Sequence, residues 1–352
     1  MRILYFSHVD LFWIKQRPQF LSEEMSKNTK LSKFKFIYNF NYNRSVLQKN
    51  KVNLDSKAIY KIPFSNRFNI IDDLSSLFIK MWLYLYVKMA RYDFVVISHP
   101  SLIKCIPSNV NIIYDCMDDN AYFFKKDAPH YKKIMRNELE TIRKAKYVSV
   151  TSQALKTTIK ERYGIESNLV RNAFGGEIID IYEEDRLDND KVLAAYIGTI
   201  SEWLDTESLL YSLDENKNLE IHLYGPIESH VSLPVHSRLI YKGVLEHSNL
   251  ASTSKSYDYL LMPFKLNELI CKVDPVKIYE YINFNKNIIS IRYPEVERFD
   301  DFVFFYNNKN ELSTILSNQR KKKYSLKQRM DFLQENTWEC RAEQFLSYIN
   351  DN

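Results

Sequence analysis

Short apolar runs alternate with helix-length amphipathic segments twice along this chain, and this alternation restricts the fold more than any other feature. In the first half the strand-like runs are residues 3–6, 34–40, 58–62, 94–97, 112–114 and 147–151. The helical patterns of that half are residues 16–26, 71–91, 130–145 and 153–163. Short buried strands that alternate with helices favour parallel pairing, with both faces of the sheet covered. The pattern predicts an α/β fold of doubly wound units.

The alternation pauses near the middle of the chain and then begins again. Gly175 and Gly176 precede the acidic run EEDRLDND at residues 183–190, which is typical of a linker. After it, the strand-like runs are residues 192–196, 220–224, 239–242, 259–262 and 287–291. A chain of 352 residues exceeds the size at which single cores usually stop growing. We therefore expect two Rossmann-like domains.

Glycine is scarce, so its positions carry information. The chain has 6 glycines, where average usage would give roughly 25. Three of them, Gly198, Gly225 and Gly243, directly follow predicted strands of the second half. A residue without a Cβ lets the backbone turn tightly or approach a ligand closely. These strand ends are therefore expected to border a ligand.

The stretch at residues 262–291 predicts a strand end, a loop, a helix and another strand. Pro275 stands at the helix start, where exposed amides form an anion site. Lys277 and Glu280 are three residues apart and so lie on one face of that helix. A cation, free amides and a carboxylate together suit a nucleotide diphosphate and its ribose hydroxyls. A solvated Lys–Glu pair on the surface is the alternative.

Composition excludes several classes of protein. The net charge of +5 is mild and the basic residues are spread along the chain, so no nucleic-acid binding is expected. The four cysteines form no C-x-x-C pair, which argues against a zinc site or disulfide framework and for a reducing compartment. No secretion signal is visible, and no segment reaches about 18 uncharged apolar residues. A cytoplasmic location is expected.

Two local clusters suit an anionic membrane surface. One is residues 78–91, FIKMWLYLYVKMAR, and the other is the basic run 320–323 with Lys327 and Arg329. An ordinary core face is the stronger interpretation of the first cluster, because apolar residues recur there at helical spacing. These residues are Leu74, Leu77, Phe78, Met81 and Leu85. Peripheral contact with the inner membrane surface stays open as an alternative.

Several motifs resemble those of bacterial sugar-nucleotide glycosyltransferases of the GT-B fold, close to glycosyltransferase family 4 and to the teichuronic-acid and exopolysaccharide enzymes. In the second half the motifs are YIGTISEWLD (196–205), LYGP (223–226), YKGV (241–244), MPF (262–264) and DPVKIYEY (274–281). In the first half they are WIKQRPQF (13–20), YDCMDDN (114–120) and VTSQAL (150–155). Their order and spacing together are fairly specific, and they span most of the chain.

The resemblance implies two Rossmann-like doubly wound domains that face a central cleft. Residues 1–172 would bind the acceptor, residues 173–190 would be the linker, and residues 191–335 would bind the nucleotide sugar. Residues 336–352 would form a helix that crosses back to the first domain. A helix that only caps the second domain is the alternative.

The resemblance also implies roles for individual residues. Lys277 is expected to bind the diphosphate and Glu280 the ribose. The full expected donor site is Gly198, Thr199, Gly225, Gly243, Val244, Pro263, Pro275, Lys277 and Glu280. The first Glu of the family 4 pattern falls on Lys272, and Glu268 is a substitute only by proximity in sequence. Trp203 and Asp205 either shape the donor site or begin the next helix.

Candidates for the chemistry lie in the first half. Asp118 and Asp119 follow a predicted strand and are candidates for the base that takes the acceptor hydroxyl proton. The alternative for both is a place in a polar loop or at a helix N-cap. Asp115 is expected to position them without contacting the substrate. His8 is a third catalytic candidate, with a structural role as its alternative.

Arg17 and Trp13 are the acceptor-binding candidates, and for Arg17 a surface salt bridge is the alternative.

The predicted activity is transfer of a hexose from a nucleotide-diphosphate sugar, with UDP favoured, to a growing surface polysaccharide or lipid-linked acceptor. No metal or other cofactor is expected, and inverting and retaining mechanisms both stay open. A sugar-nucleotide epimerase or phosphorylase, and a non-catalytic nucleotide-sugar-binding protein, are the alternatives on the same fold.

Overall fold

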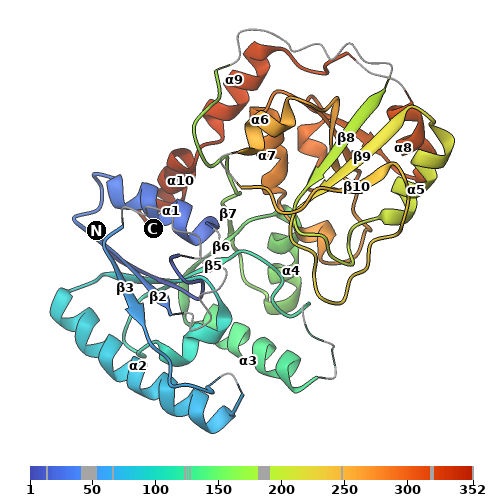
Figure 1. Cartoon of the computed structure of the whole chain (residues 1–352). Helices are drawn as coiled ribbons and strands as arrows, with labels where there is room; N and C mark the ends of the chain where they lie inside the picture. The colour runs from blue at the N-terminus through green and yellow to red at the C-terminus, as the bar shows by residue number, and fades with distance from the viewer. Residues whose placement is uncertain are drawn as a thin grey trace. The chain divides into compact units, whose positions relative to one another are not determined.

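The computed structural model describes residues 1–12, 15–40, 54–65, 67–122, 124, 126, 128–180, 191–246, 249–317 and 321–350 (Figure 1). Its contacts divide the chain into two compact units. Unit 1 contains Met1–Asn172 and Thr337–Asn352, and unit 2 contains Ala173–Asn336. The acidic run expected to be a linker, residues 183–190, lies outside the described residues.

Unit 1 is built on a seven-stranded parallel sheet in the order β3-β2-β1-β4-β5-β6-β7. The strands are β1 (Arg2–Ser7), β2 (Lys33–Asn39), β3 (Ser56–Ile59), β4 (Phe94–Ile97), β5 (Ile112–Cys116), β6 (Ala145–Val150) and β7 (Asn168–Leu169). In the register, Ile3 of β1 lies opposite Phe34 on one side and Phe94 on the other. The central strands β4 and β5 are buried along their whole length, as parallel strands covered on both faces must be.

The helices of unit 1 begin and end where their local chemistry requires. They are α1 (Arg17–Lys27), α2 (Asn69–Ala90), the 3₁₀ helix η1 (Pro100–Cys105), α3 (Pro129–Lys144) and α4 (Gln153–Tyr163). A proline in the first turn starts α1, η1 and α3, where its missing N–H costs no hydrogen bond. The Ser152 hydroxyl accepts from the Leu155 N–H at the start of α4, and Gly164 ends that helix at φ +72°.

Unit 2 is built on a six-stranded parallel sheet in the order β10-β9-β8-β11-β12-β13. Its strands are β8 (Val192–Ile197), β9 (Leu219–Tyr224), β10 (Leu239–Tyr241), β11 (Tyr259–Met262), β12 (Asn287–Ile291) and β13 (Val303–Tyr306). The sequence patterns did not predict β13 or the two-residue β7. Both are short strands at sheet edges, with too few residues to show a period.

In the part of unit 2 that the structure describes, seven short helices accompany the sheet. They are α5 (Thr206–Glu215), α6 (Leu250–Ser254), η3 (Ile270–Lys272), α7 (Val276–Asn283), η4 (Glu297–Phe299), α8 (Lys309–Leu316) and α9 (Leu326–Glu335). The Asp205 carboxylate accepts from the Ser208 N–H at 3.1 Å and so caps α5, which agrees with the plainer of its two interpretations. Arg329, expected in a surface basic cluster, is instead buried and donates to the carbonyls of Ile282 and Asn283.

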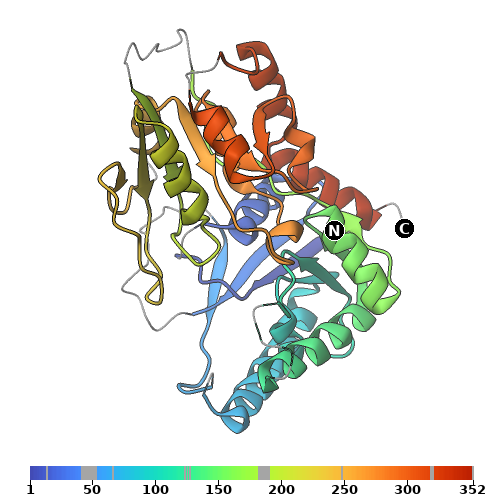
Figure 2. The same cartoon turned by 90° about the vertical axis from the view of Figure 1, so that its right-hand side faces the viewer.

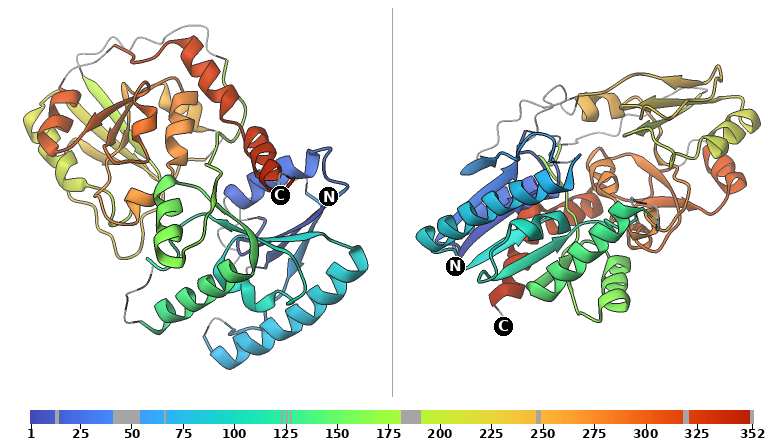
Figure 3. Two further views of the ribbon diagram at one scale, coloured as in Figure 1. Left: turned by 180° about the vertical axis from the view of Figure 1, so that it is seen from behind. Right: turned by 90° about the horizontal axis from the view of Figure 1, so that it is seen from below.

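The last helix, α10 (Trp338–Asn350), packs on unit 1, where it lies beside α1 (Figures 1 and 3). The Trp338 and Phe20 rings stack with their centroids 5.5 Å apart. Arg341 donates from Nε to the Asn172 carbonyl at 3.1 Å, and Gln344 donates to the Leu169 carbonyl at 3.0 Å. The apolar side of α10 is buried through Trp338, Ala342, Phe345, Leu346 and Ile349.

The structure contradicts the core-face interpretation of α2. Leu74, Leu77, Phe78, Met81 and Leu85 are all exposed. The buried side of α2 carries Asp72, Ser75 and Ser76 together with Ile79, Leu83 and Val87. Asp72 explains the choice of face, because its carboxylate lies 3.5 Å from the Lys61 ammonium and 3.1 Å from that of Lys133. Among the described residues, no helix is long and apolar enough to cross a membrane.

Removal of α10 is expected to destabilise unit 1 and to leave unit 2 folded. Burial of four large apolar side chains, at about 1.5–3 kcal/mol each, is a large fraction of a domain's stability. A chain cut before Trp338 should lose amide-exchange protection in β1, β5 and β6 and keep it in β8 and β11. Hydrogen exchange with mass spectrometry measures both. Loss of protection confined to unit 2 would contradict this assignment of α10.

Candidate functional site

Three glycines line up at the carboxyl ends of neighbouring strands in unit 2. The Gly198 N–H donates to the Tyr224 carbonyl at 2.9 Å, and the Gly225 N–H donates to the Gly243 carbonyl at 2.9 Å. Gly225 has φ +129°, and a Cβ added to it would lie 2.0 Å from the Gly198 carbonyl oxygen. Only glycine allows this close approach of backbone to backbone. The strand ends therefore form a smooth edge with no side chains at these points.

Lys277 of α7 lies over this edge. A Cβ on Gly198 would lie 2.5 Å from Lys277 Cε, 2.8 Å from its Nζ and 2.9 Å from the Tyr196 hydroxyl oxygen. The Tyr196 hydroxyl donates to the Thr199 carbonyl at 2.7 Å. The structure thus brings Gly198, Thr199 and Lys277 together, although Thr199 and Lys277 are 78 positions apart in the sequence.

The Lys277 ammonium has no polar partner among the described residues. No hydrogen bond or ion pair joins it to any residue that the structure describes. The alternative of a solvated Lys277–Glu280 ion pair therefore does not describe this lysine. Burial lowers the pKa of Lys277, while the charge of Glu280 raises it. A partly buried cation without a partner lowers the stability of the folded state, and a bound anion would offset that loss.

A buried network fixes the start of α7. Asp274 is buried and pairs with Arg298, which also donates to the Tyr279 hydroxyl at 2.7 Å. The Tyr281 hydroxyl donates to the Ile197 carbonyl at 3.3 Å and so ties α7 to the end of β8. No side chain caps the first amides of α7. They remain a site of partial positive charge next to Lys277.

The other residues expected to bind the donor differ in burial and in contacts. Glu280 is partly buried, one turn along α7 from Lys277. Val244 is exposed after β10, while Pro263 is buried and its carbonyl accepts from the Asp205 N–H at 2.8 Å. Pro263 thus holds the loop of residues 199–205 in place. Pro275 is the N-cap residue of α7.

Glu268 and Lys272, the two positions considered for the first Glu of the family 4 pattern, both lie before α7. Glu268 is exposed, and Lys272 is the last residue of η3. The Trp203 carbonyl accepts from the Lys265 N–H at 2.7 Å, and its ring packs against the core of unit 2.

Asp118 and Asp119 are adjacent in sequence but opposite in environment. Asp119 is only 4% exposed, and both its oxygens accept from Arg162, at 3.1 and 3.0 Å. Arg162 also lies 3.4 Å from Glu138, which accepts from the Tyr163 hydroxyl at 2.6 Å. Asp119 is therefore held in a buried ion-pair network, and the expectation that it serves as a base is corrected.

The Asp118 carboxylate differs from that of Asp119 in its contacts. The side chain of Asp118 makes no hydrogen bond or ion pair with any residue in the described part of the chain. Burial raises the pKa of Asp118 to about 6, although the charge of Arg17 lowers it, and the charge of Asp119 adds to the rise. The carboxylate is thus ionised at neutral pH and a better proton acceptor than an ordinary aspartate.

His8 lies at the end of β1 beside a second histidine that the sequence patterns missed. Its Nδ1 lies 3.0 Å from the Ser98 hydroxyl oxygen, and its ring centroid lies 4.7 Å from that of His99. Burial, and to a smaller extent the charge of His99, lower the pKa of His8 to about 3. His8 is neutral at pH 7. The missed signal was that His99, like His8, follows closely on an apolar strand, β4, which ends at Ile97.

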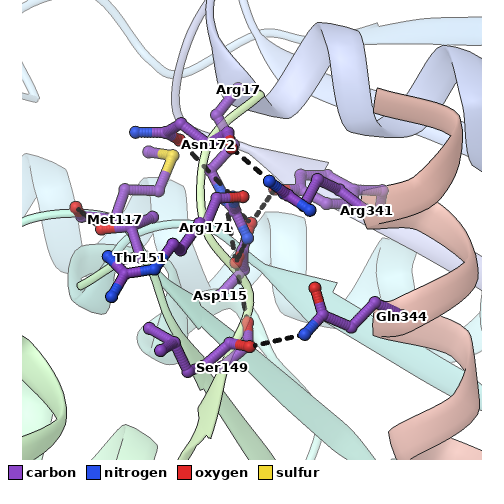
Figure 4. A network of polar contacts seen from close by, with 11 residues as sticks. Arg17, Asp115, Met117, Ser149, Thr151, Arg171, Asn172, Arg341 and Gln344 are labelled. Atoms are coloured by element: carbon purple, nitrogen blue, oxygen red, sulfur yellow. Dashed lines mark hydrogen bonds and ion pairs between the residues drawn. The ribbon is translucent and has the colours of Figure 1, made fainter. Parts of the chain in front are cut away.

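The structure corrects the expectation for Arg17. It is 5% exposed and donates to the Asp115 carboxylate from Nε and Nη2, the latter at 2.9 Å, and to the Arg171 carbonyl at 3.0 Å (Figure 4). Asp115 also accepts from the hydroxyls of Tyr5 and Ser149. Arg17 therefore organises the interior of unit 1, in a buried ion pair rather than the surface salt bridge of its alternative.

Trp13 lies outside the described residues.

Comparisons with known proteins give a match in structure but not in sequence. No protein-family model matches the chain, and no curated protein does. The sucrose-phosphate synthase of Thermosynechococcus elongatus matches with a TM-score of 0.75 at 11% identity, over 100% of this chain and 99% of that one. Anabaena HepE, solved in complex with UDP and glucose, matches with a TM-score of 0.70 at 11% identity, over 100% of both chains. The lipopolysaccharide outer core galactosyltransferase WaaB matches with a TM-score of 0.67 at 13% identity, over 100% of this chain and 99% of that one.

The chain has the GT-B fold. This confirms the predicted fold class, an α/β architecture of two Rossmann-like units, each with a parallel sheet. Identities of 11–13% show the fold alone. A shared fold does not fix the activity, which depends on the residues of the site.

Asp118→Asn is expected to stabilise unit 1 at pH 7.5. Folding raises the pKa of Asp118 from 3.8 to about 6, so ionisation of this carboxyl destabilises the folded state. This destabilisation is absent at a pH below both pKa values and is complete at a pH above about 6. The gain should be about 1–3 kcal/mol at pH 7.5 and should shrink towards pH 4.5. Denaturant unfolding at both pH values measures it.

Asp119→Asn is the matched control. It leaves Arg162 without its bidentate partner and should destabilise unit 1 by about 2–4 kcal/mol at pH 7.5. An equal decrease in the free energy of unfolding for Asp118→Asn and Asp119→Asn would show that the two carboxylates do not differ in environment.

Proposed function

We propose that the protein is a glycosyltransferase that moves a hexose from a UDP-sugar to a growing bacterial surface polysaccharide or lipid-linked saccharide. The observation that carries the proposal is the unpaired Lys277 ammonium over Gly198, beside the uncapped start of α7. HepE, of the same fold, was solved with UDP and glucose, which supports UDP as the nucleotide. The motif resemblance to family 4 and to exopolysaccharide enzymes supports the class of acceptor.

Unit 2 holds the donor in this proposal. Lys277 and the first amides of α7 bind the diphosphate, and Glu280, one turn along, accepts hydrogen bonds from the ribose hydroxyls. When the bond from sugar to phosphate breaks, negative charge grows on the leaving diphosphate. A fixed cation and fixed amides at that point stabilise the transition state more than the ground state.

Unit 1 supplies the base. Asp118 accepts the proton of the acceptor hydroxyl as that oxygen attacks the sugar, and its pKa of about 6 suits this step at neutral pH. Neutral His8, at another strand end of unit 1, contributes a hydrogen bond to the acceptor. A base of this kind is what an inverting reaction requires. Lys272, in place of the first Glu of family 4, removes a contact that retaining members of that family make.

Lys277→Met is expected to abolish most of the stabilisation by UDP. At a concentration one hundred times its Kd, a ligand stabilises by about 2.7 kcal/mol, which corresponds to a rise of about 5 °C in the Tm of unit 2. The variant without ligand should be as stable as the wild type or slightly more so, because a partly buried charge is removed. Differential scanning fluorimetry with UDP measures both.

Lys217→Met is the matched control, because Lys217 is exposed before β9, at the opposite end of that strand from Gly225. It should keep the full UDP shift. A wild-type protein that shows no shift with any nucleotide diphosphate would refute the donor site.

Asp118→Asn is expected to retain the UDP shift and to lose sugar transfer by about 10²–10⁴-fold, the usual contribution of a general base. Mass spectrometry of donor and acceptor mixtures measures transfer, with a panel of nucleotide sugars. In the wild type, kcat should rise as pH increases through about 6, where Asp118 loses its proton.

The same assays separate the alternatives. Turnover of the donor without any acceptor would indicate an epimerase or phosphorylase. Binding without turnover in any mixture would indicate a non-catalytic protein.

A further inference from the structure

Helix α2 exposes a continuous apolar face on unit 1. Seven large side chains recur at helical spacing, and each is between 48% and 82% exposed. They are Ile70, Leu74, Leu77, Phe78, Met81, Leu85 and Met89, here called the α2 face. The helix is 22 residues long and runs along an outer side of unit 1 (Figures 1 and 2). Single exposed apolar residues are ordinary, whereas a contiguous row indicates an interaction surface.

The two acidic residues of α2 are both paired with lysines. The acidic residues of α2 are Asp72 and Asp73. Asp72 is buried among Lys61, Lys104 and Lys133, and the Asp73 carboxylate accepts from Lys104 at 2.5 Å. Both acids are thus neutralised by lysines, and the net charge around the α2 face is positive.

Lysines and aromatic rings border the α2 face on both sides. On one side the Lys57 ammonium lies 4.7 Å from the Trp82 ring centroid, and Trp82 stacks on Tyr86. On the other side lies the Tyr84 ring, whose centroid is 5.8 Å from the ammonium of Lys88. Apolar residues framed by lysines and by aromatic rings with polar edges are the composition that suits a lipid–water interface.

We propose that the α2 face docks unit 1 on an anionic membrane surface, with α2 lying in the plane of the interface. The seven apolar side chains enter the boundary between headgroups and acyl chains. Lys80 and Lys88 extend their ammonium groups to the lipid phosphates, as long basic side chains do at such boundaries. The inference goes beyond the proposed function and does not depend on the donor site.

A second copy of the chain fits this face less well. Lys88 follows Leu85 by three residues and so lies within the exposed arc. A dimer formed through this face would enclose Lys88 with no acidic side chain of α2 left to pair with it. A buried cation without a partner is strongly unfavourable, whereas lipid phosphates supply the missing negative charge.

The test is sedimentation of the full chain with vesicles of phosphatidylglycerol and phosphatidylethanolamine. The wild type is expected to bind, and Leu77→Ser/Phe78→Ser/Met81→Ser should bind at least about tenfold more weakly. Lys80→Gln/Lys88→Gln should lose about two- to fivefold, and only on vesicles that contain the anionic lipid. Ile165→Ser/Val235→Ser/Leu326→Ser, with three exposed apolar residues changed elsewhere, is the matched control and should bind as the wild type does.

Two further measurements keep the test decisive. The variants should keep the wild-type Tm and UDP shift, so failure of docking and failure of the donor site are told apart. Should the serine variant unfold, Phe78→Trp replaces it, and its added fluorescence should be quenched by brominated lipids. Absence of vesicle binding by the wild type, or equal binding by the serine variant, overturns the proposal. A wild-type dimer that the serine variant abolishes, without vesicle binding, overturns it in favour of a second copy.

Discussion

The buried ion pair between Arg17 and Asp115 is the contact on which the arrangement of unit 1 depends. Isolated buried charges are unfavourable, and a buried pair is tolerated when further hydrogen bonds satisfy both partners. Here Asp115 accepts from Arg17, Tyr5 and Ser149, which joins β1, α1, β5 and β6 at one point. Arg17 also holds the Arg171 carbonyl, and the neighbouring Asn172 carbonyl accepts from Arg341 of α10. One pair thus connects both ends of the chain to the sheet edge that carries Asp118.

Paired and unpaired charges divide the structural residues from the candidate functional ones. Asp119 with Arg162, and Asp274 with Arg298, are buried pairs that hold loops and helix starts in place. Asp118 and Lys277 are partly buried without such partners, and burial shifts the pKa of each towards its neutral form. A folded protein maintains such groups at a cost in stability, which is typical of sites that bind or react. The paired networks make this cost tolerable by fixing the surrounding backbone.

Helix α2 shows the limit of a periodic pattern. The spacing of Leu74, Leu77, Phe78, Met81 and Leu85 correctly indicated a helix with one apolar face, but the inference that this face is buried was wrong. Periodicity locates a face without saying what covers it. Three lysines distant in sequence surround Asp72, which lies on the buried face of α2. No local pattern contains that information.

Local periodicity and the scarce glycines encode the alternation of strands and helices, the α/β class and the places where strands end. The sequence also placed Lys277 and Glu280 on one helix face and Asp118 just beyond a strand. Which charges find a partner became visible in the folded chain. The tertiary structure withdrew Arg17 and Asp119 into buried pairs, left Asp118 and Lys277 without partners, and revealed His99 beside His8. The physical reason is that the state of a charge depends on neighbours brought from distant parts of the chain, whereas helix and strand formation depends mainly on nearby residues.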